Sequence, residues 1–137
     1  MAEVQWTNWS VVKNLRVERP DGSALTDQLE QWHGIWFASI GASYYRAPNW
    51  TIRSGFAFDP TPVRNQFRTA RIPEADRYWL AVGLGYQWTA DLHLDAAYVH
   101  IFGGGGPINE MSQTGDLLIG RYSDHIDVVS LSATLRF

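Results

Sequence analysis

Apolar and polar residues alternate along much of the chain, and residues 126–137, IDVVSLSATLRF, show the pattern most clearly. Every second position is apolar: Val129, Leu131, Ala133, Leu135 and Phe137. The positions between them are polar: Ser130, Ser132, Thr134 and Arg136. Successive side chains of a β-strand point to opposite faces, so this period predicts a strand with one apolar face and one polar face.

Five further segments alternate in the same way and predict strands: residues 3–18, 35–46, 50–59, 78–89 and 92–102. The first is long, and its apolar parity changes between Trp6 and Leu15, which predicts a bulge. No convincing helical period is present in the sequence. We therefore expect an all-β chain of six antiparallel strands, counting the terminal segment.

The links between these segments alternate strictly between long and short. Strands 35–46 and 50–59, like strands 78–89 and 92–102, are separated only by tight turns. The other three links are long. If the chain weaves up and down, the tight turns share one edge of the sheet and the long loops share the other. This segregation is typical of outer-membrane β-barrels.

Aromatic residues gather towards both ends of the predicted apolar face. Near the tight-turn edge these are Tyr44, Trp50, Tyr86, Trp88 and Phe137, and near the long-loop edge they are Trp36, Phe58, Tyr78 and Tyr98. Two aromatic bands around an aliphatic zone are typical of membrane interfaces. The face of opposite parity is then the barrel lumen. A soluble, aromatic-rich β-sandwich or barrel has the same alternation and remains the alternative.

Composition excludes several other functions. The net charge is −3 and Lys13 is the single lysine, so we expect no nucleic-acid partner. Cysteine is absent, which excludes thiolate metal sites. His93 and His100 fall on opposite faces of one predicted strand and cannot share a metal. We expect neither an enzyme nor a metal or cofactor.

Two stretches carry a family resemblance: YYRAPNWTIRSGFAFDPTPV at residues 44–63 and RTARIPEADRYWLAVGLGYQW at residues 68–88. They closely resemble the C-terminal part of the FadL/TodX (OMPP1) family, outer-membrane channels for long-chain fatty acids and other hydrophobic compounds. The resemblance covers essentially the whole chain. Its shared positions are Trp50, Arg53, Gly55, Asp59, Pro62, Val63, Arg68, Ile72, Pro73, Asp76, Arg77, Trp79 and Leu80.

The resemblance implies a barrel of about fourteen strands with an N-terminal plug, of which this chain supplies about the last six. Residues 1–137 are therefore expected to form one incomplete domain in the bacterial outer membrane, in contact with its lipid. Phe137 resembles the C-terminal signal that the outer-membrane assembly machinery reads. The implied function is passive uptake of a hydrophobic small molecule, either a fatty acid or an aromatic hydrocarbon.

Four residues of the inward parity are candidates to line the path of an acyl chain: Phe37, Tyr45, Trp79 and Ala81. For Trp79, packing against a plug is an equally good interpretation. The loop that precedes residue 35 has no lysine, although fatty-acid-binding members of the family can place one there. The identity of the hydrophobic ligand therefore stays open.

Charged residues of the inward parity allow two interpretations. Arg53 is suited to a ligand carboxylate, or it pairs with Asp59 or Asp95 to hold the wall together. The second interpretation is favoured. In the loop RIPEADR, Asp76 and Arg77 are expected to take part in ion pairs that fold the loop on itself.

Overall fold

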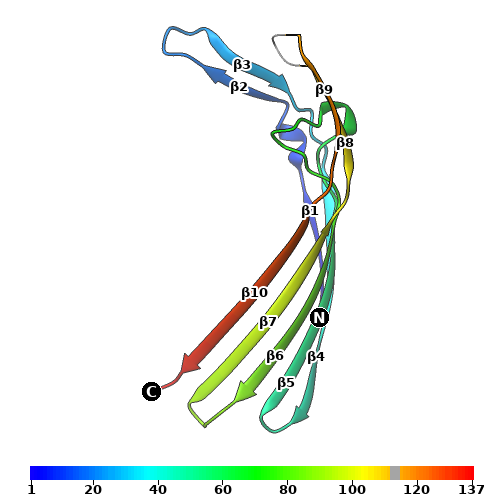
Figure 1. Cartoon of the computed structure of the whole chain (residues 1–137). Helices are drawn as coiled ribbons and strands as arrows, with labels where there is room; N and C mark the ends of the chain where they lie inside the picture. The colour runs from blue at the N-terminus through cyan, green and yellow to red at the C-terminus, as the bar shows by residue number, and fades with distance from the viewer. Residues whose placement is uncertain (112–114) are drawn as a thin grey trace.

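The computed structural model describes residues 1–111 and 115–137, and the largest unit in this part of the chain is one curved antiparallel sheet (Figure 1). The strand order of this sheet is β1-β4-β5-β6-β7-β10. The strands are β1 (Ala2–Thr7), β4 (Ile35–Ala47), β5 (Trp50–Asp59), β6 (Arg77–Gln87), β7 (Leu92–Gly103) and β10 (His125–Leu135). The prediction of an all-β, antiparallel, up-and-down barrel segment is confirmed.

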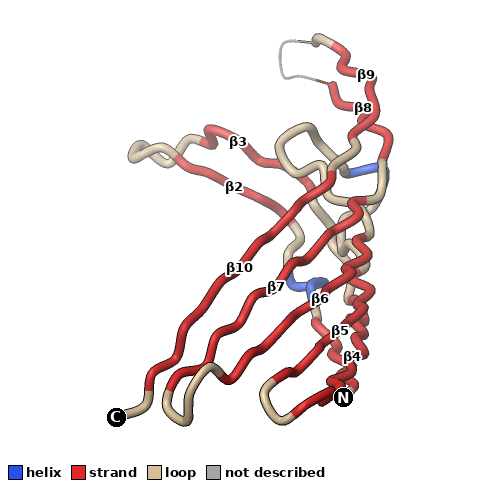
Figure 2. Tube along the Cα trace, turned by 60° about the horizontal axis from the view of Figure 1, so that its bottom comes forward, coloured by secondary structure: helices blue, strands red, loops and turns tan. Residues whose placement is uncertain are grey.

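Strands that follow one another in the main sheet are neighbours in space. The turns that join β4 to β5 and β6 to β7 lie at one edge, together with the C-terminus, and the longer connections lie at the opposite edge (Figure 2). The sheet does not close on itself, because β1 and β10 are its two outer strands. The described part of the chain is thus an open section of wall.

The strand register keeps the two predicted faces intact across the sheet. Ile40 lies opposite Phe56, and Phe56 lies opposite Leu80. On the other face, Ser39 lies opposite Ala57. We call the face that carries Ile40, Phe56, Leu80, Leu84 and Leu131 the apolar face, and the opposite one the polar face. This register is strongly specified, because a shift of one residue would move every apolar side chain of a strand to the opposite face.

The first predicted strand, residues 3–18, is divided in the structure. After β1 the chain makes a single 3-10 turn, Trp9–Val11, and the side chain of Asn8 accepts a hydrogen bond from the backbone N–H of Ser10 at 3.2 Å. The following strand β2 (Asn14–Glu18) leaves the sheet and pairs with β3 (Ala24–Leu29). The expectation of one bulged strand was wrong, because the change of parity marks the end of β1.

Two of the long connections contain hairpins of their own. One is the β2–β3 pair, and the other joins β8 (Gly106–Met111) to β9 (Leu117–Tyr122). Both rise beyond the long-loop edge of the main sheet (Figure 1). A second 3-10 turn, Asn65–Phe67, lies in the β5–β6 connection. None of the helices in the described residues is long and apolar enough to cross a membrane.

Most of the buried side chains lie near the long-loop edge. Val63 and Ala75 are buried there, and so is Arg68, whose Nε donates to the carbonyl of Glu74 at 2.7 Å. A Cβ atom at Gly106 would collide with the guanidinium of Arg68, so this close approach requires glycine. The loops therefore have a small packed core, whereas much of the sheet has both faces uncovered.

Candidate functional site

Aromatic rings contact one another at both ends of the apolar face. Towards the tight turns, the ring centroids of Trp50 and Tyr86 lie 4.3 Å apart. Towards the long loops, those of Phe58 and Tyr78 lie 5.0 Å apart. Aliphatic residues occupy the zone between these two aromatic groups. One of them, Ile40, is 63 % exposed. Aromatic girdles around an exposed aliphatic band fit the two interfaces and the hydrocarbon interior of a bilayer.

A hollow of about 290 Å³ lies on the sheet near the middle of β4, β5 and β6. Small residues leave this space, because Ala57 lies opposite Trp79 and Gly55 lies opposite Ala81. Trp79 and Ala81, both expected to line the wall, are brought together here. The indole Nε1 of Trp79 is shielded from solvent and has no hydrogen-bond partner among the described residues. The lining is therefore largely apolar on an otherwise polar face.

The two other wall candidates lie away from this hollow. Phe37 pairs with Gln5 towards the long-loop edge. Tyr45 lies beside the tight turn, opposite Thr51, and is 75 % exposed. The structure therefore brings together two of the four apolar candidates and spreads the other two along the strand of β4.

A hydrogen-bonded polar cluster lies on the same face, nearer the tight turns. Arg53 Nη1 contacts Asp95 Oδ1 at 2.7 Å, and His93 Nε2 lies 3.2 Å from the same oxygen. His93 Nδ1 is in turn 3.0 Å from Gln87 Oε1. A Cβ atom at Gly85 would lie only 3.0 Å from Arg53 Nη1, so the absent side chain makes room for the pair. We call Arg53, Gln87, His93 and Asp95 the wall cluster.

The wall cluster places Arg53 in the arrangement that the pairing interpretation describes. The side chains of Arg53 and Asp95 are 45 % and 30 % exposed, so water screens their attraction. Such a pair contributes about 0–1 kcal/mol to stability. Sequence reasoning missed Gln87 and His93 as members of the cluster. Strand parity could have identified them, since His93 and Asp95 are two residues apart on β7 and therefore face the same side of the sheet.

The charged residues of the β5–β6 loop pair differently from the expectation. Arg77 Nη2 contacts Glu74 Oε1 at 2.7 Å, and Arg77 Nε lies 3.6 Å from Asp59 Oδ2. Asp59 therefore pairs with Arg77 and not with Arg53. Asp76 Oδ1 accepts a hydrogen bond from the backbone N–H of Thr61 at 2.9 Å, so Asp76 holds the loop by a backbone contact. The loop folds around one ion-pairing arginine.

In the described part of the chain, no group of three or more His, Asp and Glu side chains is arranged to hold a metal ion.

Outside the main sheet, burial raises the pKa of the Tyr122 phenol, and its hydrogen bond to Asp124 acts in the same direction. That tyrosine therefore stays neutral at ordinary pH.

An antiparallel sheet with girdles on an apolar face and a polar opposite face is the wall of a transmembrane β-barrel. Residues 1–137 match the family described as "Outer membrane protein transport protein (OMPP1/FadL/TodX)". The chain belongs to this family of bacterial outer-membrane proteins. In such a wall the polar face lines the lumen and the apolar face meets lipid.

Curated relatives are similar over most of this chain. The "Long-chain fatty acid transport protein" of Salmonella typhi is 34 % identical over 105 residues, which cover 77 % of this chain and 24 % of that protein. "Outer membrane protein P1" of Haemophilus influenzae is 32 % identical over 112 residues, covering 82 % of this chain and 24 % of that protein. The chain spans about a quarter of the length of these relatives.

A solved structure has the same fold. The crystal structure of a Pseudomonas aeruginosa FadL homologue superposes with a TM-score of 0.88 at 34 % identity. The match covers 98 % of this chain and 31 % of that chain. The curved open sheet of Figure 1 is therefore similar to a section of that barrel.

Proposed function

We propose that this chain forms part of the wall of a channel for passive uptake of hydrophobic compounds, long-chain fatty acids among them, across the bacterial outer membrane. The observation that carries the proposal is the largely apolar hollow between Trp79 and Ala81 on the face that lines the lumen. The names of the curated relatives support the same substrate class.

Burial of apolar surface is the driving force in this proposal. An acyl chain that leaves water for the hollow gains about 25 cal/mol for each Å² of apolar surface removed from water. Trp79 offers a large flat surface, and the small residues Gly55 and Ala57 let an acyl chain approach the wall closely. Movement from one such hollow to the next requires no chemical energy.

Polar wall residues have a supporting part in the proposal. Asp95 already neutralises Arg53, so the guanidinium stiffens the wall and a ligand carboxylate has to compete for it. We also infer that further strands complete the barrel, because each unpaired backbone group at the edges of β1 and β10 costs several kcal/mol in lipid. Phe137 stays a prediction as the contact with the assembly machinery.

The test fills the hollow without touching the outward face. A chimaera in which residues 1–137 replace the matching segment of the Escherichia coli long-chain fatty acid transport protein provides a complete barrel. In that chimaera, Ala81→Phe is expected to lower uptake of radiolabelled oleate about tenfold, since the added ring occupies the space of the acyl chain and a tenfold loss corresponds to about 1.4 kcal/mol of lost binding. Uptake is measured in cells that lack their own transporter.

The matched control is Leu80→Phe, which adds an aromatic ring at the adjacent position on the opposite face. It is expected to leave uptake within about twofold of the unsubstituted chimaera, because a ring at the lipid face is tolerated. Surface amounts of folded barrel are compared by gel mobility. Unchanged uptake in a folded Ala81→Phe barrel overturns the proposed path.

A further inference from the structure

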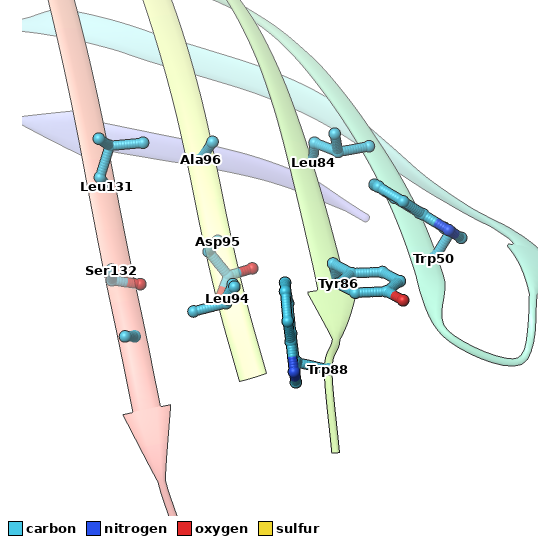
Figure 3. A pocket seen from close by; sticks show the side chains of 10 residues that line it. Trp50, Leu84, Tyr86, Trp88, Leu94, Asp95, Ala96, Leu131 and Ser132 are labelled. Atoms are coloured by element: carbon cyan, nitrogen blue, oxygen red, sulfur yellow. The ribbon is translucent and has the colours of Figure 1, made fainter. Parts of the chain in front are cut away.

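Two hollows of the main sheet differ in what covers them. The outward hollow of about 560 Å³ is lined by strands β5, β6, β7 and β10 and by Trp88 beside them, and no other loop residue among those described lines it (Figure 3). A hollow of about 480 Å³ on the inward face is lined by strand residues such as Ile35 and Arg77, and also by Ile72 of the β5–β6 loop. This loop, residues 60–76, therefore folds over the inward face at the long-loop edge.

Backbone hydrogen bonds tie the folded loop to the chain segment that follows β7. The N–H of Gly104 donates to the carbonyl of Asp76 at 2.7 Å. The N–H of Ala70 donates to Glu110 Oε2 on β8 at 2.9 Å. The loop is thus held both at its end and near its middle, and its position does not depend on the strands that flank it alone.

Arg68 lies at the centre of these contacts and is only 5 % exposed. Its Nε donates to the carbonyl of Glu74 within the loop, and its guanidinium packs against Gly106, where an added Cβ atom would collide with it. Its Nη1 is shielded from solvent and has no hydrogen-bond partner among the described residues.

The burial of Arg68 opposes the hydrogen bonds that hold the loop. A buried cation with an unpaired nitrogen is costly, and water hydrates that nitrogen once the loop moves away from the sheet. The folded position of the loop is therefore held by packing and backbone hydrogen bonds against the cost of a buried charge. A segment balanced in this way opens more easily than one with a purely apolar contact.

We propose that residues 60–76 form a lid over the lumen, closed where Arg68 packs on Gly106, and that this lid limits the size of the molecules that enter. The long-loop edge of an outer-membrane barrel faces the outside of the cell, so the lid lies at the external mouth. The proposal concerns access to the lumen and goes beyond the compound that is transported.

The experiment measures how fast reagents outside the cell reach a thiol beneath the lid. Ile35→Cys places a single cysteine in this cysteine-free chain, in the hollow that the lid covers. Cells that carry the chimaeric barrel with this change are treated with a bulky, charged fluorescent maleimide or with a small methanethiosulfonate. Each rate is divided by the rate for the unfolded chimaera. With the lid closed, the small reagent is expected to react readily and the bulky one slowly.

One glycine pair tests the contact between Arg68 and Gly106. Gly106→Ala is expected to speed labelling by the bulky reagent about tenfold, equivalent to about 1.4 kcal/mol, because the added methyl group displaces the guanidinium. Gly120→Ala is the matched control on the neighbouring strand β9, since an added Cβ atom there has nothing within 4 Å. It is expected to leave both rates unchanged.

A second pair carries the test if the Gly106→Ala barrel does not fold. Glu110→Ala removes the acceptor of the Ala70 N–H and is expected to speed labelling by the bulky reagent about threefold, the effect of one modest hydrogen bond. Asn109→Ala is the control, because Asn109 is exposed and points to the other side of β8. It is expected to have no effect.

Two outcomes overturn the lid. One is equal labelling by the bulky reagent in each variant and its control, all folded by gel mobility. The other is a parent barrel in which the bulky reagent already reacts at the rate of the unfolded chimaera. The measurement follows a thiol reaction and not uptake, so the result for Ala81→Phe judges the proposed function separately.

Discussion

The two faces of the same six strands meet their surroundings in opposite ways. The outward face presents large apolar side chains, and Leu131 is 78 % exposed. The inward face presents small or polar residues such as Ser39, Gly41 and Ala57 at the neighbouring positions. An exposed apolar area of this extent would be a liability in water, whereas in the membrane it matches the hydrocarbon. The difference shows that strand parity decides which solvent a side chain meets.

Charged residues on the two faces show the same contrast. Inward, Asp95 contacts Arg53, and both remain partly open to solvent. Outward, Asp127 contacts the uncharged phenol of Tyr98 and the imidazole of His100. The inward pair needs little from its surroundings because water screens it. The outward carboxylate depends on its partners and on the polar head groups, so the same residue type is costlier there.

The largest expected effect comes from placing one charge on each face at adjacent positions. Leu131→Arg is expected to destabilise the folded barrel by about 2–4 kcal/mol, the cost of an arginine at the lipid midplane. Ser130→Arg, one residue away and facing the lumen, is expected to cost less than about 1 kcal/mol. Urea unfolding of the chimaeric barrel in vesicles measures both. Equal losses would show that Leu131 does not face lipid.

The sequence predicted the six strands and their faces because alternation reports directly on the two environments. It did not predict where the first strand ends, since a change of parity is compatible with a bulge or with an exit from the sheet. The Asn8 side chain and the 3-10 turn after it decide between these. The β2–β3 and β8–β9 hairpins were missed, because strands without a lipid face need no regular alternation.

Parity also predicted which residues face the lumen, but not their partners. Arg53 lies on β5 and Asp95 on β7, with β6 between them. They meet because Gly83 and Gly85 leave the intervening strand bare, opposite Arg53 and Asp95 respectively. We call this path without side chains across β6 the lane between Arg53 and Asp95. It depends on the register of three strands, which no single segment encodes. The same reason hid the contact between His100 and Asp127, which come from β7 and β10.

An intermediate effect is expected from closing that lane. Gly85→Ala places a Cβ atom 3.0 Å from both Arg53 Nη1 and Asp95 Oδ1, so the pair must move apart. We expect a loss of about 1 kcal/mol in the free energy of unfolding. At Gly83 the nearest neighbour of an added Cβ atom is 3.6 Å away, an ordinary contact. Gly83→Ala is expected to be neutral or slightly stabilising, because alanine restricts the unfolded chain.

Both glycine variants are compared by urea unfolding in the same vesicles. A difference between them of about 1 kcal/mol supports the lane between Arg53 and Asp95. If Gly85→Ala is as stable as Gly83→Ala, then the wall cluster is looser than its distances indicate. In that case Arg53 is available to a ligand carboxylate, and the alternative interpretation of Arg53 gains support.

The smallest effect is expected from removing the inward ion pair itself. Arg53→Ala is expected to lower the free energy of unfolding by less than about 1 kcal/mol at low salt, since both partners are partly exposed. At 1 M salt, where the screening length falls to about 3 Å, most of this difference disappears. Arg53→Lys retains the charge without the planar guanidinium and serves as the control. A loss above about 2 kcal/mol that persists in high salt would mean that the inward face is dry. The inward face would then not be solvated, and the contrast between a water-facing and a lipid-facing side of the sheet would be wrong.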